Sequence, residues 1–131
     1  MERKGIFMAE KKYGVTLDTK NKVIISMASG FIKENEAKEI INQFKEAIRK
    51  ANTSEYGLIV DGSDSKPVSP DVVPLMAEVI KLYTETPFKK KYFVEINSAL
   101  NQTQIKRVGN GAMADFIIVR SQEEAIKSFN S

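Results

Sequence analysis

Short hydrophobic segments alternate with segments of helical periodicity along this chain. Residues 13–18 and 23–28 are rich in β-branched residues and flank a polar turn, a pattern that predicts a β-hairpin. After Gly30 the period changes, and apolar residues recur at three- and four-residue spacing from Ala37 to Ala51, which predicts a helix. Further strands are predicted at residues 56–60, 92–96 and 116–119, and further helices from about Ser69 to Pro87, at 98–108 and after Ser121.

The order of these elements is β-β-α-β-α-β-α-β-α. Strands that alternate with helices imply right-handed crossovers, so the sequence predicts an α/β fold with a single mixed, mostly parallel sheet. The opening hairpin contributes the antiparallel strand. Residues 12–131 are expected to form one domain, and residues 1–11 a mobile N-terminal tail.

The loop DGSDSKPVSPDVVP, residues 61–74, joins the third predicted strand to the second predicted helix. Ser69 can cap a helix through its hydroxyl, Pro70 suits the first helical position, and the Asp71 carboxylate suits the positive end of the helix dipole. Pro74 falls where internal hydrogen bonds should begin. Either the first turn is irregular, or the regular helix begins nearer Pro74.

Three kinds of chemistry compete with this structural interpretation of the loop. A phosphate cradle needs a glycine-rich run, and only Gly62 is present. A calcium loop needs oxygen ligands at alternating positions and a distal glutamate, which the spacing of the loop carboxylates does not give. Acid–base catalysis by Asp61, Asp64 and Asp71 lacks an accompanying nucleophile–base pair or oxyanion motif. No metal or cofactor is therefore predicted.

Composition narrows the possible functions further. The 131 residues include neither cysteine nor histidine, which removes disulfides, thiolate chemistry and the usual neutral-pH base. Neither a signal peptide nor a membrane span is predicted, and a cytoplasmic location is expected. The net charge is +3, and the longest run of basic residues in the sequence is Lys89–Lys91. We interpret that run as a solvated strand entrance, so no nucleic-acid partner is expected.

The step from Val60-Asp61 through a serine-bearing loop into a helix, together with the element order, resembles the STAS family of anti-sigma-factor antagonists. The resemblance covers roughly residues 13–129 and implies a STAS-like fold without enzymatic activity. It implies a partner protein of the kinase or anti-sigma type, bound through residues 62–71 and the following helix, and association of two copies is plausible. The implied regulatory or partner-binding residues are Asp61, Ser63, Ser65, Ser69 and Asp71.

In antagonists of this family the loop typically reads D-S-S-G-L, and its first serine is phosphorylated. Counting from Asp61 places Ser69 at the motif aspartate and Pro70 at the phosphoacceptor, whereas a shift of one residue places Ser69 at the acceptor. Both registers remain open from the sequence. The motif glycine is absent in either one.

A second functional hypothesis is a small-molecule or lipid carrier, as in STAS-like domains similar to SEC14-type modules. Its apolar pocket would be formed by Met76, Ile80, Tyr83 and Leu100 on the second and third helices. The amides Asn97, Asn101, Gln102 and Gln104 form either an ordinary polar helix face or a recognition patch. The GNGAM segment, residues 109–113, is predicted to be a turn with positive-φ residues.

Overall fold

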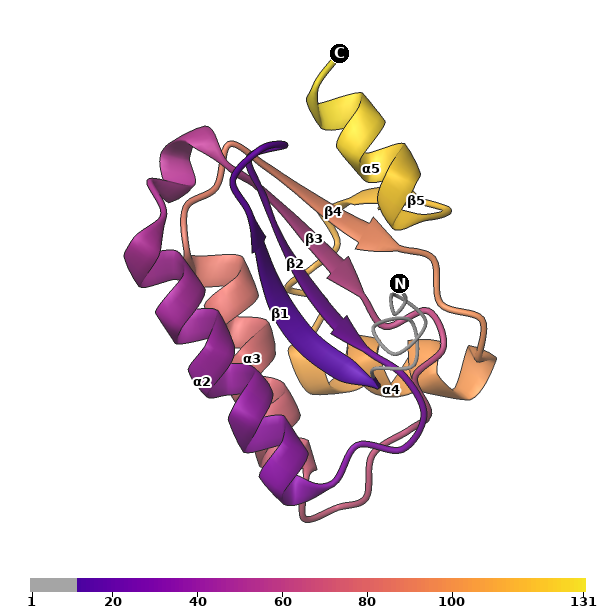
Figure 1. Ribbon diagram of the computed structural model, residues 1–131. Coiled ribbons are helices and arrows are strands. Elements are labelled where there is room, and N and C mark those ends of the chain that lie inside the picture. Colours follow the sequence, from indigo (N-terminus) through magenta and orange to yellow (C-terminus); the bar gives the residue numbers. More distant parts are fainter. Residues whose placement is uncertain (1–11) are drawn as a thin grey trace, which may run out of the picture.

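The computed structural model describes residues 12–131 as a five-stranded sheet with helices on both faces (Figure 1). The strands follow the order β1-β2-β3-β4-β5; β1 is antiparallel to β2 and the others are parallel. They span Tyr13–Asp18, Val23–Ala28, Gly57–Asp61, Lys90–Val94 and Ile117–Val119. The mixed, mostly parallel sheet predicted from the sequence is confirmed. The expectation of a mobile tail at residues 1–11 lies outside the described residues.

The helices cover the sheet unequally. α2 (Glu34–Lys50) packs on β1 and β2, and α3 (Val73–Glu85) packs beside α2 on the same face. α5 (Gln122–Phe129) contacts β3, β4 and β5 from the opposite face. α4 (Ala99–Gly109) packs on α3 but makes few contacts with the strands, and it lies across the end of the sheet where β2, β3 and β4 finish (Figure 1). A short 3-10 helix, η1 (Thr53–Glu55), precedes β3.

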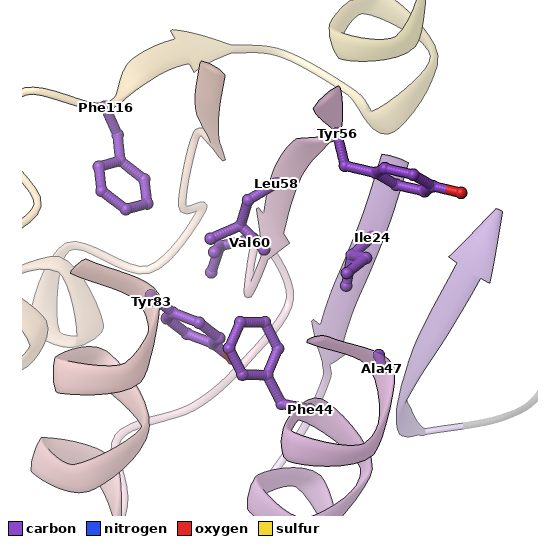
Figure 2. Packing of buried hydrophobic residues seen from close by; sticks show 8 residues of the cluster. All are labelled: Ile24, Phe44, Ala47, Tyr56, Leu58, Val60, Tyr83 and Phe116. Atoms are coloured by element: carbon purple, nitrogen blue, oxygen red, sulfur yellow. The ribbon is translucent and has the colours of Figure 1, made fainter. Parts of the chain in front are cut away.

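The larger core lies between the sheet and the pair α2 and α3. Leu58 and Val60 face α2 and α3, whereas Ile59 between them points to the opposite face of the sheet, as the period of two in a strand requires. Phe44 is completely buried, and its ring meets that of Tyr83 edge to face, with centroids 5.1 Å apart (Figure 2). Such aromatic pairs add to the stabilisation from area burial.

The second core lies under α5. Val23, Ile59 and Tyr92 are completely buried there, and Ala125 of α5 fits among them without exposure. A Cβ atom on Gly57 would lie 2.9 Å from Cδ1 of Phe129, so only glycine lets this ring lie flat on β3. The C-terminal helix thereby covers this face of the sheet over β3, β4 and β5.

Helix starts fit the sequence-based expectations except at α3. The Ser121 hydroxyl accepts the N–H of Glu124 at 3.0 Å, while the Glu124 carboxylate accepts the N–H of Arg120 at 2.8 Å. Ser121 therefore caps α5 as predicted, although the reciprocal bond reaches one residue further back than in a standard capping box. Ser98 caps α4 by accepting the Asn101 N–H.

The prediction that Ser69 caps α3 is wrong. The helix begins at Val73, and the Ser69 hydroxyl donates to the Asp71 carboxylate instead of accepting a backbone N–H. An irregular turn closed by the Val72 N–H on the Ser69 carbonyl precedes the helix. The alternative in which the regular helix starts nearer Pro74 is the correct one, because Pro74 then occupies the first turn, where its missing N–H costs no hydrogen bond.

The basic run at the start of β4 is partly structural. Lys91 donates to the carbonyl of Thr84 at 2.8 Å and lies 5.7 Å from the centroid of the Phe116 ring. Burial lowers the pKa of Lys91. Lys89 and Lys90 remain exposed, in agreement with the interpretation of the run as a solvated strand entrance.

Candidate functional site

The loop that follows β3 lies at the carboxyl edge of the sheet, and its first residues are held by internal hydrogen bonds. One Asp61 carboxylate oxygen accepts both the N–H and the hydroxyl of Ser63, at 3.1 and 2.7 Å, and the other accepts the Gln122 side chain at 2.6 Å. The Ser65 hydroxyl donates to the Gly62 carbonyl at 2.6 Å. Three of the five implied regulatory residues therefore form side-chain hydrogen bonds within the chain: Asp61, Ser63 and Ser65.

The loop after β2 supports the same segment from the side. The Gly30 N–H donates to the Asp64 carbonyl and the Lys66 N–H donates to the Gly30 carbonyl, each at 2.9 Å. The two loops form an isolated parallel bridge between Gly30 and Ser65. Gly30 has a φ of +66°, which side chains other than glycine rarely adopt, so the bridge depends on this residue.

Amide side chains near α4 hold the loop from its other side. Asn97 donates to the Asp64 carboxylate at 2.7 Å, and Asn101 donates to both the carbonyl and the hydroxyl of Ser65. Gln104 accepts the Val68 N–H at 2.8 Å and donates to the Val68 carbonyl at 2.9 Å. We call Asn97, Asn101 and Gln104 the amide clamp. These side chains pair with the loop rather than forming an ordinary polar face.

Asn101 is the most buried member of the clamp. It has no exposure to solvent, and its Oδ1 atom has no hydrogen-bond partner among the described residues. The orientation of the amide is fixed because its nitrogen must face the Ser65 carbonyl, which only a donor can satisfy. The unpaired oxygen is a cost in the native state, so the sensitivity of this position to change comes from the two hydrogen bonds that the amide nitrogen donates to Ser65.

Beyond the clamp the loop opens to solvent beside the start of α2. A groove of about 230 Å³ separates the two segments. We call it the docking groove and define it by six of its lining residues: Phe31, Lys33, Pro67, Val68, Ser69 and Asp71. The Phe31 ring is 68% exposed, although large apolar side chains are normally buried. Ser69 and Asp71, the remaining two implied regulatory residues, are both exposed here.

An apolar cavity of about 110 Å³ lies beneath the clamped loop, between the sheet and the helices. Met76, Ile80 and Tyr83 of α3 line it, as the carrier hypothesis requires. Leu100 does not line it: its side chain is 76% exposed, because it lies on the face of α4 that is turned away from α3. The inclusion of Leu100 in the predicted pocket is therefore corrected. We call this space the inner cavity.

A hydroxyl pair lies at the wall of the inner cavity. The Tyr83 hydroxyl is 2.5 Å from the hydroxyl of Ser26 on β2, and both residues are buried. Burial raises the pKa of Tyr83 to about 12, while its hydrogen bond to Ser26 acts in the opposite direction. Tyr83 therefore stays neutral well above the pH at which an exposed tyrosine ionises.

This raised pKa predicts an alkaline loss of stability. The unfolded chain loses the Tyr83 proton near pH 10 and the native state near pH 12, so the stabilisation is complete below pH 10 and disappears as the pH rises towards 12. The two-unit difference corresponds to about 2–3 kcal/mol. We expect urea unfolding at pH 8 to 11.5 to show this decline in the wild type and a shallower one in Tyr83→Phe. Equal slopes in the two proteins would contradict the assignment.

Two kinds of feature are absent from the part of the chain that the structure describes. Residues 12–131 contain no group of three or more acidic side chains placed to hold a metal ion. Within the same residues, every helix is too short or too polar to cross a bilayer.

Comparisons with known proteins place the fold. An uncharacterized protein of the DUF3478 family from Shewanella loihica PV-4, described as having a SpoIIAA-like fold, superposes with a TM-score of 0.62. The match covers 89% of this chain and 91% of that one at 14% sequence identity. No protein-family model matches the sequence, and no curated protein is similar to it. The chain thus has the SpoIIAA-like fold that the resemblance to STAS proteins predicted.

Proposed function

We propose that this protein is a non-enzymatic regulatory domain that binds a partner protein through the docking groove. The observation that carries the proposal is an exposed Phe31 beside a loop whose backbone is held in place from two sides. Aromatic anchors beside a groove are typical of the few residues that supply most of the energy of an interface. A loop that is already ordered loses little conformational entropy when a partner binds.

The charge around the groove suggests which partners suit it. Ser69 and Asp71 face Lys33 and Glu34 across the groove, so basic and acidic side chains lie close together. Such a mixed rim favours a partner with complementary charges of both signs and a central apolar residue. A kinase or anti-sigma-type regulator, as the STAS resemblance implies, fits this description.

Among the three serines from Ser63 to Ser69, Ser69 offers the most accessible hydroxyl. Those of Ser63 and Ser65 donate to acceptors within a half-buried loop. The Ser69 side chain is exposed, and within residues 12–131 it bonds only to Asp71, two residues further on. Ser69 is therefore the serine of this loop that a kinase reaches most easily, which suits the register with Ser69 as phosphoacceptor, and a phosphate there would add negative charge next to Asp71.

Substitution of Phe31 tests the docking groove. We expect Phe31→Ser to weaken the binding of a cognate partner by about 10- to 100-fold, as for a central aromatic anchor. The measurement is a calorimetric titration with purified candidate partners, beginning with anti-sigma-type kinases. Leu100→Ser is the matched control, because Leu100 is also highly exposed but lies outside the groove. Equal affinity of the wild type and Phe31→Ser would remove the groove as the binding surface.

The inner cavity supports a second candidate, an apolar small-molecule or lipid carrier. Its wall is almost entirely aliphatic and aromatic, as in sites for apolar ligands. Its volume of about 110 Å³ is well below the roughly 300–1,000 Å³ of ordinary ligand pockets. A carrier function therefore requires additional space next to this cavity.

A further inference from the structure

A third hollow lies between α4, the turn at residues 110–114 and β5. We call it the α4–β5 groove; its volume is about 490 Å³. This volume falls within the range of small-molecule sites. Its principal lining residues are Ile80, Phe93, Ile105, Lys106, Met113 and Ile118. The groove exists because α4 packs on α3 and leaves this part of the sheet uncovered.

The α4–β5 groove and the inner cavity share a common wall. Ile80, Phe93, Ile105 and Met113 line both spaces. Met113 is the member of this wall that can move most readily, because its side chain is flexible and only partly buried. An occupant of the groove can therefore extend inward only if it is slender. A partner helix, about 10 Å wide, is too thick to enter the inner cavity, whereas an alkyl chain is not.

The polarity of the groove indicates what the outer end of such a chain carries. Among residues 12–131, its lining is otherwise apolar and Lys106 is the one charged residue in it. None of the carboxylates in residues 12–131 forms an ion pair with Lys106. Ile118, at the mouth, is 58% exposed, which is unfavourable for a large apolar side chain unless something covers it.

We infer that the α4–β5 groove binds a single-chain amphiphile, with its anionic head group at Lys106 and its alkyl tail directed past Met113 towards the inner cavity. This inference rests on the second candidate function, the carrier, and gives it a site and a ligand class. It does not involve the docking groove. Both possible kinds of ligand have one alkyl chain and an anionic head group, which is either a carboxylate or a phosphate.

The test uses dodecanoate, dodecyl phosphate and the neutral dodecanol as probes below their micellar concentrations. We expect saturable binding of the anionic probes to the wild-type chain, at least tenfold weaker binding to Ile118→Glu, and unchanged binding to Ile117→Glu. Ile117 is the matched control because it is an exposed isoleucine of the same strand that does not line the groove.

Lys106→Gln should weaken binding of the anionic probes about three- to tenfold and leave the binding of dodecanol unaffected. The stronger of the two anionic probes identifies the head group.

The methyl signals of methionine locate the tail. In spectra of chain labelled at the methionine methyl groups, we expect both Met113 and Met76 to shift on binding, because Met76 lines only the inner cavity. A shift of Met113 alone would overturn the inward path. If the probes bind without an effect of Ile118→Glu, the inferred site is wrong while a carrier function stands. If none of the three probes binds, both amphiphile binding in the α4–β5 groove and the carrier function are contradicted.

Discussion

We expect Phe44→Ala to lower the free energy of unfolding by about 4 kcal/mol, as for other completely buried aromatic rings. Phe44 is fully buried, and its ring contacts those of Tyr83 and Phe88 between the sheet and α3. Its truncation removes apolar contact and leaves a void that α2 and α3 cannot close without leaving the strands. Urea unfolding followed by circular dichroism measures the change.

Phe31→Ala is the matched control for that measurement. Both substitutions delete the same ring, but Phe31 is 68% exposed, so its loss should change stability by less than about 0.5 kcal/mol. Substitution of Phe44 therefore tests stability, whereas substitution of Phe31 tests partner binding with little change in stability. A loss below about 2 kcal/mol for Phe44→Ala would show that the core tolerates rearrangement better than its packing indicates.

The second large effect is expected at the amide clamp. Asn101→Ala removes the donor that satisfies the Ser65 carbonyl, and we expect it to cost about 2–3 kcal/mol. The effect should also be local, because the loop loses its most buried anchor while the sheet is unchanged. Hydrogen exchange of the Ser65 and Lys66 amides measures it, since their bonds to Gly62 and Gly30 hold the loop closed. We expect both amides to exchange faster.

Thr103→Ala is the control on the same helix. Thr103 is exposed, and among the residues that the structure describes its hydroxyl bonds only to the Ala99 carbonyl, so its removal should leave the exchange of the loop amides unchanged. Asn101→Ala should also weaken partner binding, although Asn101 does not line the docking groove. If exchange at Ser65 and Lys66 were unaffected by Asn101→Ala, the bridge to Gly30 together with Asn97 and Gln104 would hold the loop without Asn101.

The fold could be predicted from the sequence because its signals are local. The strands at 13–18 and 23–28 match the predicted residues, since β-branched residues and a polar turn specify a hairpin over a short stretch. Helix periodicity likewise predicted α2, whose buried residues include Ala37, Ile40 and Phe44. The positive φ angles of Asn110 and Gly111 follow from the predicted turn.

The candidate site was less predictable because its contacts join distant parts of the chain. Asn101 and Ser65 are 36 residues apart, and so are Gln104 and Val68, so the partners of these amides cannot be read from spacing. The misassigned Ser69 cap has a different, local cause: its hydroxyl donates to the carboxylate of Asp71, two residues further on. Leu100 was misplaced because α4 covers little of the sheet. One sequence signal could have identified Phe31: it is an aromatic residue in the segment between the second predicted strand and the first predicted helix.

The packing of Phe129 on Gly57 has a consequence for the synthesis of this protein. Until α5 has left the ribosome, Val23, Ile59 and Tyr92 have no helix to cover them. The nascent chain can form the larger core with α2 and α3, but it presents an open apolar sheet face during that interval. We therefore expect chains interrupted before Gln122 to be captured by chaperones or to aggregate, whereas chains that include Phe129 escape both.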